Sequence, residues 1–378
     1  MAMRNEVTAM RAAGHEVFVL GFHLGELSAD ARAVNQDFAG TFVATQRKSL
    51  VRATMSNPLL PYQVSSRTAD AIGLAQAKAW RPDLVVCHHE WTLPVALQLR
   101  EELGGVPVIL RAHNDELRYY RHLLKAAKGL RAPYLLAEYL RIRRFLGAVA
   151  DYPIANIWFM SPDDVTPRFA QVPHTIIPPI MYNEPVSEVA SSSVGRSRTV
   201  TFVGSLDIPH AVTGIEWFLT QTWPKVLRRV PDAHFTLAGR RPGPELVQLA
   251  ASTPNVTLIP SPEDINEVLA GSRVFVNPIF AGSGVNLKLG DPMRWGIPVV
   301  TTTIGARGLS GLYGALQVGD TPETFAERCA VLLGDDRTWQ ESRNRLLAQR
   351  DAYSATSVGA LLNASLLDHA VRPGGRRW

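Results

Sequence analysis

The stretch GSGVNLKLGDPMRWGIPVV, residues 282–300, opens on a glycine-rich turn and closes on a β-branched strand. The Gly-Ile-Pro sequence before the strand predicts the end of a helix, because glycine ends helices and proline cannot continue them. The turn Gly282–Gly284 is expected to lead into that helix, where free backbone N–H groups bind anions such as phosphate. Lys288 and Asp291 are three residues apart, so a helix would place both on one face. Two interpretations stay open: an ion pair in solvent, or part of a phosphate site.

The composition is that of a globular protein with more than one core. The chain has 378 residues, of which 46% are hydrophobic and 19% charged. This length favours two domains, and this apolar content excludes a disordered chain. The net charge of +5 is small for the length, so we do not expect nucleic acid as a partner.

Cysteine usage and the absence of long apolar runs predict a cytoplasmic protein. Cys87 and Cys329 are the only cysteines, which gives no disulfide framework and no cysteine metal motif. No run approaches the roughly 20 apolar residues that span a bilayer. The N-terminus also lacks the apolar core of a signal peptide.

Short β-branched runs alternate with helical patterns along the chain, which indicates parallel sheets built from βαβ units. In the first half, the expected strands are 16–22, 41–46, 83–89, 106–113 and 152–160. In the second half, they are 199–206, 233–239, 255–260, 273–280 and 297–302. The fold class is therefore α/β, with two doubly wound Rossmann-like domains that face a cleft.

The chain divides into four parts on this basis. The N-terminal domain is expected over 1–178, and a linker rich in Pro and Ser over 179–198. The C-terminal domain is expected over 199–350. Residues 351–378 are expected to form a last helix, which returns to the N-terminal domain, and a tail.

The first domain is predicted to lack its first strand. It opens on a helix near residues 5–13, which leads to the strand at 16–22. A doubly wound domain normally begins with a strand in the middle of the sheet, so its absence would leave neighbouring strands unpaired. Two explanations stay open, a missing N-terminus or a rearranged sheet, and we favour the first.

Several segments resemble the retaining glycosyltransferases of the GT-B fold, the large family 4 group. Residues 202–242 and 274–309 resemble the donor-binding half of that family. The sequence RAHNDELRYYRHL, at 111–123, resembles the His-Asn-x-Glu found at a strand end in many members. The resemblance implies that the N-terminal domain lies on the acceptor side and that the C-terminal domain binds the nucleotide sugar.

The resemblance also implies the residues of the site. His113 would contact the donor sugar and stabilise charge in the transition state, and Lys288 would balance charge on the leaving phosphate. Asp291 stands where the family usually has Glu, which holds the ribose hydroxyls. The donor-binding set shares the glycine turns and their neighbours: Gly204, Ser205, Arg240, Gly282, Ser283, Gly284, Val285 and Asn286.

Three departures from the family pattern alter the predicted nucleotide site. Ser283 aligns with the first acid of the family's paired-glutamate motif. Pro292 predicts a helix that starts late and so moves Asp291. The loop after the strand at 199–206 lacks the Arg and Lys that many members place on the diphosphate, and Arg240 is the predicted substitute.

No metal and no cofactor are expected, because the nucleotide sugar is a substrate. The sequence contains no Asp-x-Asp pair, which other transferases use to clamp a diphosphate through Mg²⁺. His88, His89 and Glu90 form a second strand-end cluster, which is not expected to bind metal because metal ligands must converge in space.

The segment 118–144 contains eight Lys and Arg residues and a single acid, interleaved with Tyr and Leu. Such helices contact anionic membranes or bind a lipid phosphate. A solvated helix pair explains the same pattern equally well.

The leading hypothesis is a metal-independent, hexosyltransferase-like enzyme that moves a sugar from a nucleoside diphosphate to a sugar or lipid-linked acceptor. Its expected place is polysaccharide or glycoconjugate assembly, in the cytoplasm or at the inner face of the membrane. One alternative is a catalytically impaired protein of the same fold that binds nucleotide sugars or a partner. The other is a nucleotide-sugar epimerase, which would need further acid–base groups.

Overall fold

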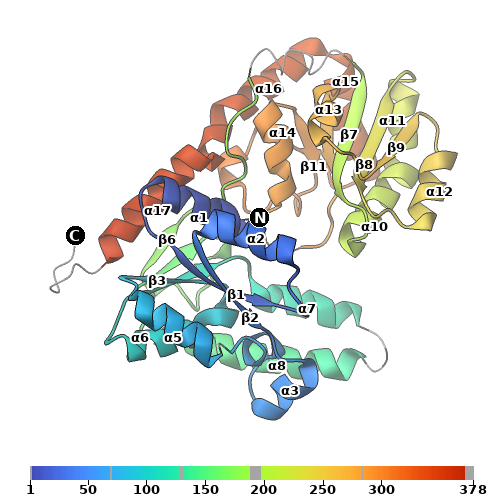
Figure 1. Cartoon of the computed structure of the whole chain (residues 1–378). Coiled ribbons are helices and arrows are strands. Elements are labelled where there is room, and N and C mark those ends of the chain that lie inside the picture. Colours follow the sequence, from blue (N-terminus) through green and yellow to red (C-terminus); the bar gives the residue numbers. More distant parts are fainter. Residues whose placement is uncertain are drawn as a thin grey trace. The chain divides into compact units, whose positions relative to one another are not determined.

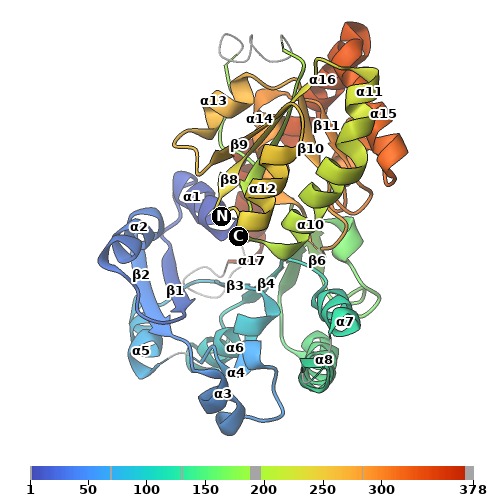
Figure 2. The same ribbon diagram turned by 90° about the vertical axis from the view of Figure 1, so that its right-hand side faces the viewer.

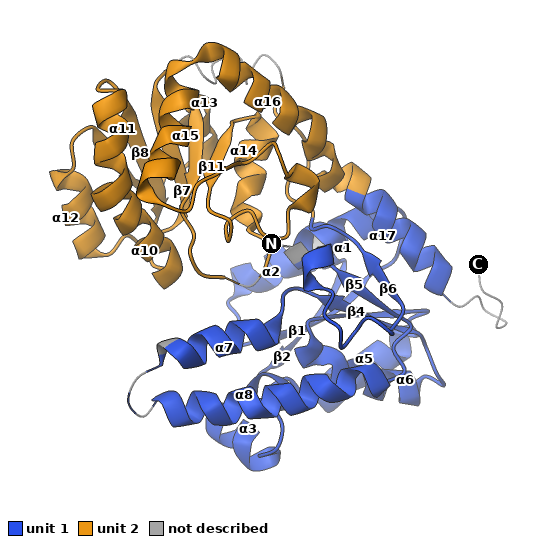
Figure 3. Cartoon of the chain, turned by 180° about the vertical axis from the view of Figure 1, so that it is seen from behind, with its two compact units in different colours: residues 1–179, 358–378 blue, residues 180–357 orange. Residues whose placement is uncertain are grey.

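The computed structural model describes residues 2–68, 70–127, 129, 131–187, 197–282 and 284–370. The chain forms two compact units (Figure 3). Unit 1 comprises residues 1–179 and 358–378, and unit 2 comprises residues 180–357. The last helix, α17 (Ala355–His369), therefore belongs mainly to unit 1.

Unit 1 is an α/β unit in which every strand pair is parallel. Its strands are β1 (Phe18–His23), β2 (Thr41–Gln46), β3 (Val85–His88), β4 (Val108–Ala112), β5 (Asn156–Phe159) and β6 (His174–Ile176). Its helices before α17 are α1 (Ala2–Ala12), α2 (Ala29–Ala39), α3 (Leu50–Ser56), α4 (Tyr62–Ser65), α5 (Ala71–Trp80), α6 (Leu93–Glu102), α7 (Glu116–Ala126) and α8 (Arg131–Ala148).

The strands of unit 1 form two sheets rather than one. β1 pairs with β2, and a separate sheet has the order β3-β4-β5-β6. One strand between β1 and β3 would join them into the order of a doubly wound domain. No strand in the described part of unit 1 takes that position. The split sheet agrees with the prediction that the central first strand is missing.

Unit 2 contains one parallel sheet of six strands, with helices on both of its faces (Figures 1 and 2). Its strands are β7 (Thr199–Ser205), β8 (His234–Arg240), β9 (Val256–Pro260), β10 (Val274–Asn277), β11 (Val299–Thr301) and β12 (Gln317–Val318). Its helices are α10 (Pro209–Trp217), α11 (Trp223–Arg229), α12 (Pro244–Ser252), α13 (Ile265–Ala270), α14 (Gly290–Trp295), α15 (Pro322–Gly334) and α16 (Asp336–Arg350). The order β12-β11-β10-β7-β8-β9 is that of a Rossmann sheet.

Aromatic side chains fill the core of unit 2. Phe218 lies in the helical segment that joins α10 to α11, and Trp223 is the first residue of α11. Their rings pack against that of Phe235 in β8, with centroids 4.9 and 5.7 Å from it. All three side chains are buried, and burial of such rings is the main source of stability. The predicted helix stop is also confirmed, because Gly296 caps α14 with a positive φ of 66° and β11 follows.

The basic segment forms α7 and α8, which run side by side (Figure 3). Its one acid, Glu138, is buried, accepts a hydrogen bond from the Tyr62 amide and pairs with Arg141. Leu136, Leu140, Arg143 and Arg144 of α8 are exposed. Among the described helices, none combines the length and the apolar character needed to cross a membrane.

Candidate functional site

The strand order of unit 2 reverses between β7 and β10, which pair in parallel. In doubly wound sheets, ligands bind outside the carboxyl ends of the strands at this point. Gly204 and Ser205 end β7, and Arg240 ends β8 directly opposite Ser205. The loop that follows β10 carries the remaining predicted donor-binding residues, of which Ser283 lies outside the described residues. The sequence therefore places the described members of this set at one sheet edge.

A partly buried hydrogen-bond network positions the loop after β10. Asn286 donates from its Nδ2 to Oδ1 of Asn277, the last residue of β10, at 3.1 Å. Asn277 in turn donates to Oγ1 of Thr301, at the end of β11, at 3.0 Å. Val285 packs against Gly308, where a side chain would collide with it. These contacts hold residues 284–286 close to the ends of two strands.

The Lys288 ammonium lies against the end of β7. Its Nζ is 4.6 Å from the centroid of the Phe202 ring and 3.6 Å from where a Cβ on Gly204 would lie. Burial lowers the pKa of Lys288 to about 8, because a low-dielectric surrounding disfavours the charged form. In the part of the chain that the structure describes, no carboxylate forms an ion pair with it. A partly buried, unpaired cation at the switch point suits a diphosphate.

Asp291, the second residue of α14, is partly buried beside this lysine in sequence but does not pair with it. Burial raises the pKa of Asp291, and Arg294 opposes that rise. Within the described ranges there is no ion pair between Lys288 and Asp291, which excludes the interpretation of a surface ion pair. Each charge is left to interact with a ligand or with water.

The α-helix expected directly after the glycine turn begins only at Gly290. Residues Leu287–Leu289 form a 3₁₀ turn, and α14 starts only at Gly290. A side chain at Gly290 would collide with the carbonyl oxygen of Met181, so the start of the helix is fixed by close backbone packing. The late start expected from Pro292 is confirmed. The expectation that the glycine turn opens directly onto an α-helix is wrong, because residues 285 and 286 and a 3₁₀ turn come between Gly284 and α14.

Few other cations lie at this edge. Arg240 is exposed, and the neighbouring Arg241 pairs with Asp207 of the loop after β7 at 2.8 Å. His210, in the first turn of α10, has a pKa lowered by burial and by the charge of Lys288. Sequence analysis missed His210, because a single histidine after a proline carries no spacing signal. Its imidazole lies close enough to Lys288 to feel the charge of the ammonium.

In unit 1, His113 follows β4 and lies in a cluster of three histidines. Its Nε2 is 3.1 Å from Nδ1 of His88, and its ring stacks on that of His89 with centroids 4.0 Å apart. Burial and then the two neighbouring imidazoles hold the pKa of His113 far below its usual range. His113 is therefore neutral at pH 7, so it can exchange a hydrogen bond with a sugar hydroxyl but cannot supply a positive charge.

A fully buried ion pair supports this cluster. Arg111 of β4 donates through Nε to Oε1 of Glu6, in α1, at 2.9 Å, and through NH1 to the Ile177 carbonyl at 2.7 Å. The other oxygen of Glu6 lies 3.8 Å from Nε2 of His88. Sequence analysis missed this pair because its members are 105 residues apart. The ion pair holds α1 against β4, the strand that His113 follows.

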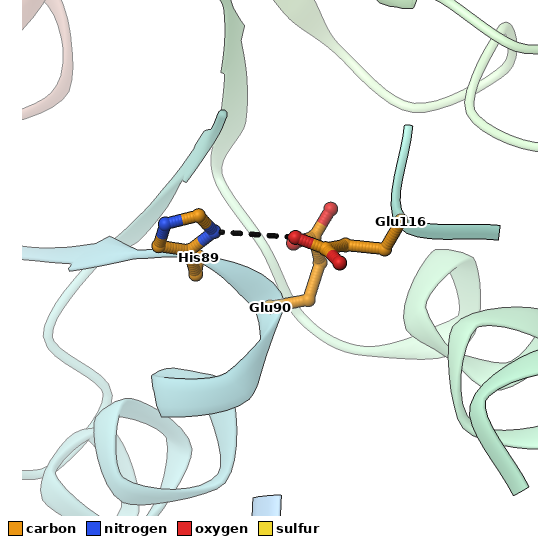
Figure 4. A group of neighbouring side chains, drawn as sticks. All are labelled: His89, Glu90 and Glu116. Atoms are coloured by element: carbon orange, nitrogen blue, oxygen red, sulfur yellow. Dashed lines mark ion pairs between the residues drawn. The ribbon is translucent and has the colours of Figure 1, made fainter. Parts of the chain in front are cut away.

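The same strand ends bring His89 close to two glutamates, Glu90 and Glu116 (Figure 4). Glu116 follows His113 in the HNDE sequence, and Glu90 starts the turn after β3. The sequence singled out both glutamates as neighbours of histidines, but it gave no sign that they would meet.

Comparison with known proteins identifies relatives of both units. Residues 197–335 match the family described as "Glycosyl transferases group 1", and residues 1–155 match "Glycosyl transferase 4-like domain". A Klebsiella pneumoniae protein named "Uncharacterized 44.6 kDa protein in cps region" is 26% identical over 318 residues, which are 81% of this chain and 79% of that protein.

Solved structures with a similar fold cover nearly the whole chain. Anabaena Alr3699/HepE in complex with UDP has a TM-score of 0.63 at 12% identity, over 97% of this chain and 95% of that chain. OtsA in its apo form has a TM-score of 0.60 at 12% identity, over 96% and 94% of the two chains. An α,α-trehalose-phosphate synthase (UDP-forming) from Burkholderia vietnamiensis has a TM-score of 0.57 at 13% identity, over 94% and 99%.

Proposed function

Because this chain belongs to the glycosyltransferases of the GT-B fold, we propose that it transfers a hexose from a nucleoside diphosphate to an acceptor hydroxyl, with retention of configuration. The observation that supports this most is Lys288. Its partly buried ammonium has no carboxylate partner among the described residues and lies at the switch point of the Rossmann sheet. A diphosphate supplies the negative charge that this position lacks.

The proposed reaction is a displacement on one face of the sugar. The bond between the anomeric carbon and the β-phosphate oxygen breaks, and the acceptor oxygen bonds to that carbon from the same face. The acceptor proton passes to the departing phosphate. Lys288 stabilises the charge that grows on that phosphate, and Asp291 accepts hydrogen bonds from the ribose hydroxyls. His113, being neutral, contacts the donor sugar through a hydrogen bond.

The donor-binding set completes the site in unit 2. The amides and side chains at the ends of β7 and β8 and in the loop after β10 bind the diphosphate, with His210 added to those predicted from sequence. The diphosphate charge is balanced by these protein groups, so the transfer requires no metal on the phosphates.

Similar proteins support the choice of substrates. Alr3699/HepE is described in complex with UDP and with UDP-glucose, and the Burkholderia vietnamiensis synthase is described as UDP-forming. A UDP sugar is therefore the first donor to test. The Klebsiella pneumoniae relative is described as lying in a cps region. This supports an acceptor from polysaccharide or glycoconjugate assembly, either a sugar or a lipid-linked sugar.

The exposed face of α8 supports contact with an anionic membrane from the cytoplasmic side. Leu136, Leu140, Arg143 and Arg144 are three or four residues apart, so they share one helical face that is both apolar and basic. Such a face binds anionic lipid headgroups and would bring a lipid-linked acceptor to the enzyme.

The test is a turnover assay on the full chain with UDP-, GDP- and dTDP-sugars, with and without lipid-linked acceptors. Release of nucleoside diphosphate together with a glycosylated product, detected by mass spectrometry, is the expected result. The anomeric configuration of the product, measured by NMR, distinguishes retention from inversion. Inversion would contradict the proposed displacement, and the absence of both release and nucleotide binding would contradict the function.

One observation favours a second candidate, a protein that binds nucleotide sugars without turnover. Asp207, in the loop after β7, pairs with Arg241 at the edge where the phosphates would bind. This ion pair neutralises the positive charge that Arg241 would otherwise offer to a diphosphate. Under this alternative, a nucleoside diphosphate binds with saturation but no donor is hydrolysed or transferred.

A further inference from the structure

Three side chains of unit 1 converge where β3 ends and α7 begins. His89 follows β3 directly, Glu90 opens a short 3₁₀ turn, and Glu116 is the first residue of α7. One nitrogen or oxygen atom from each lies within 4.8 Å of the others. Figure 4 shows both carboxylates on the side of the His89 ring that carries Nδ1. His89 has a φ of 65°, a conformation uncommon for residues with a side chain.

Both glutamates are buried, and one oxygen of Glu90 has no partner among the described residues. Glu90 and Glu116 are only 2% and 6% exposed, and Oε2 of Glu90 accepts no hydrogen bond from the described residues. Glu90 and Asp115 both place negative charge beside Glu116, and Arg67 is a cation that acts on Glu116 and His89. Buried carboxylates in such a site require a counter-charge.

The spacing of the atoms fits a shared metal ion better than a direct contact. Nδ1 of His89 lies 3.7 Å from Oε1 of Glu116, which is too far for a hydrogen bond. Nδ1 also has no hydrogen-bond partner elsewhere in the described structure. Two ligands of a tetrahedral Zn²⁺, each about 2.1 Å from the metal, are about 3.4 Å apart. The side chains would therefore need to move only slightly closer together for all three to bind one ion.

We propose that His89, Glu90 and Glu116 bind a divalent transition metal ion, for which Zn²⁺ has the best matching ligand preference and geometry. Three protein ligands leave a fourth position for water. The ion would join the end of β3 to the start of α7, which directly follows the loop that carries His113. Because the His113 ring stacks on His89, metal binding would fix its position. This site consists of unit 1 residues alone, whereas the proposed diphosphate site consists of unit 2 residues, and it departs from the sequence-based expectation of no metal.

The side chain of Asn114 contacts one of the proposed ligands, Glu116. Asn114 donates a side-chain hydrogen bond to Glu116, which is the kind of contact that orients a metal-binding carboxylate. The buried cysteines are poor competitors for the ion, because burial raises the pKa of both the Cys87 and the Cys329 thiols.

The experiment is a zinc titration of the tag-free full chain after EDTA treatment and dialysis, with no nucleotide or sugar present. Competition with a chromophoric chelator measures the dissociation constant, and thermal unfolding measures the stabilisation. We expect one Zn²⁺ per chain with a dissociation constant of micromolar or lower, and a higher unfolding temperature with the metal bound. X-ray absorption should show nitrogen and oxygen ligands only.

Matched variants locate the ion. His89→Gln, Glu90→Gln and Glu116→Gln should each weaken zinc binding at least tenfold, while His122→Gln and Glu101→Gln, at exposed positions of the same unit, should leave it unchanged. The two glutamate variants remove a charge that burial disfavours, so they are expected to fold without metal at least as well as the wild type.

Three results would overturn the proposal: no binding of one equivalent of Zn²⁺, equal affinity of the wild type and Glu116→Gln, or sulfur ligands in the absorption spectrum. In the first case a shared proton, rather than a metal, neutralises the two carboxyl groups. Because the zinc titration contains no donor or acceptor, a negative result would not contradict the proposed transferase function. In the same way, a failed transfer assay would not contradict the zinc site.

Discussion

Replacing Lys288 by methionine should make the protein more stable and its nucleotide site weaker at the same time. Methionine keeps the apolar length of the side chain and its contact with Phe202, but it removes the ammonium. A residue that served only to hold the fold together would show the opposite pattern. The two effects therefore separate a binding role for Lys288 from a structural one.

The stability gain follows from the pKa of Lys288. Burial lowers this pKa from 10.5 to about 8, a difference that corresponds to about 3.4 kcal/mol against the protonated form in the folded state. The side chain is partly exposed, so solvent screening reduces the expected gain to about 1–2 kcal/mol at pH 7. The wild type loses this free energy of unfolding in full below pH 8, where Lys288 is protonated in both the folded and the unfolded state. The loss disappears as the pH rises from about 8 to 10.5, so the difference in stability between the two proteins should vanish in that interval.

The loss of nucleotide affinity follows from the missing charge-assisted hydrogen bond. Such a bond contributes about 1.5–3 kcal/mol, so UDP should bind the variant about ten- to a hundredfold more weakly. In transfer, kcat should fall further than donor affinity, because the charge on the leaving phosphate grows in the transition state. UDP affinity of the wild type should also fall above pH 8, where the lysine loses its proton.

Urea unfolding and calorimetric titration with UDP, each at several pH values, measure the two effects. Lys225→Met is the matched control, because Lys225 lies in the same unit and pairs with Glu323 at 2.9 Å, away from the switch point. The control should bind UDP as the wild type does. A Lys288→Met protein that is less stable and binds UDP with unchanged affinity would refute this reasoning.

Four further predictions concern other parts of the account. Asp291→Ala should weaken UDP binding about tenfold with little change in kcat, in the same calorimetric and turnover assays, because its contact with ribose is equal in ground and transition states. The transfer rate should not respond to added Mg²⁺ or Mn²⁺, and activation by either ion would contradict a metal-independent diphosphate site. Replacing Arg143 and Arg144 by Ser should weaken sedimentation with acidic vesicles by about 1 kcal/mol per charge, whereas equal sedimentation would remove the membrane proposal. Glu6→Gln should lower the free energy of unfolding by about 3–5 kcal/mol in urea, because the buried Arg111 loses its partner, and a loss below about 1 kcal/mol would contradict that pairing.

The sequence was sufficient to predict the long, central strands. Each of the ten expected strands overlaps an observed one, because buried parallel strands are continuous β-branched runs between turns. The two strands that sequence analysis missed are β6 (His174–Ile176) and β12 (Gln317–Val318) at sheet edges. They are too short to carry a periodic pattern, and their pairing depends on a neighbour distant in sequence.

The site was less predictable than the fold, because its geometry depends on where helices start and on distant contacts. Three-residue spacing suggested that Lys288 and Asp291 share a helical face, but a 3₁₀ turn places the lysine before the helix. The pair Glu6–Arg111 and the meeting of His89 with Glu116 join separate segments of chain, which no local pattern reveals.

A crystal structure of the chain with UDP tests the central claim most directly. The account predicts the diphosphate at the carboxyl ends of β7 and β10, with a phosphate oxygen about 2.7–2.9 Å from Nζ of Lys288 and the ribose hydroxyls within hydrogen-bond distance of Asp291. UDP bound elsewhere on unit 2, or at the switch point with Lys288 turned away from the phosphates, would contradict it.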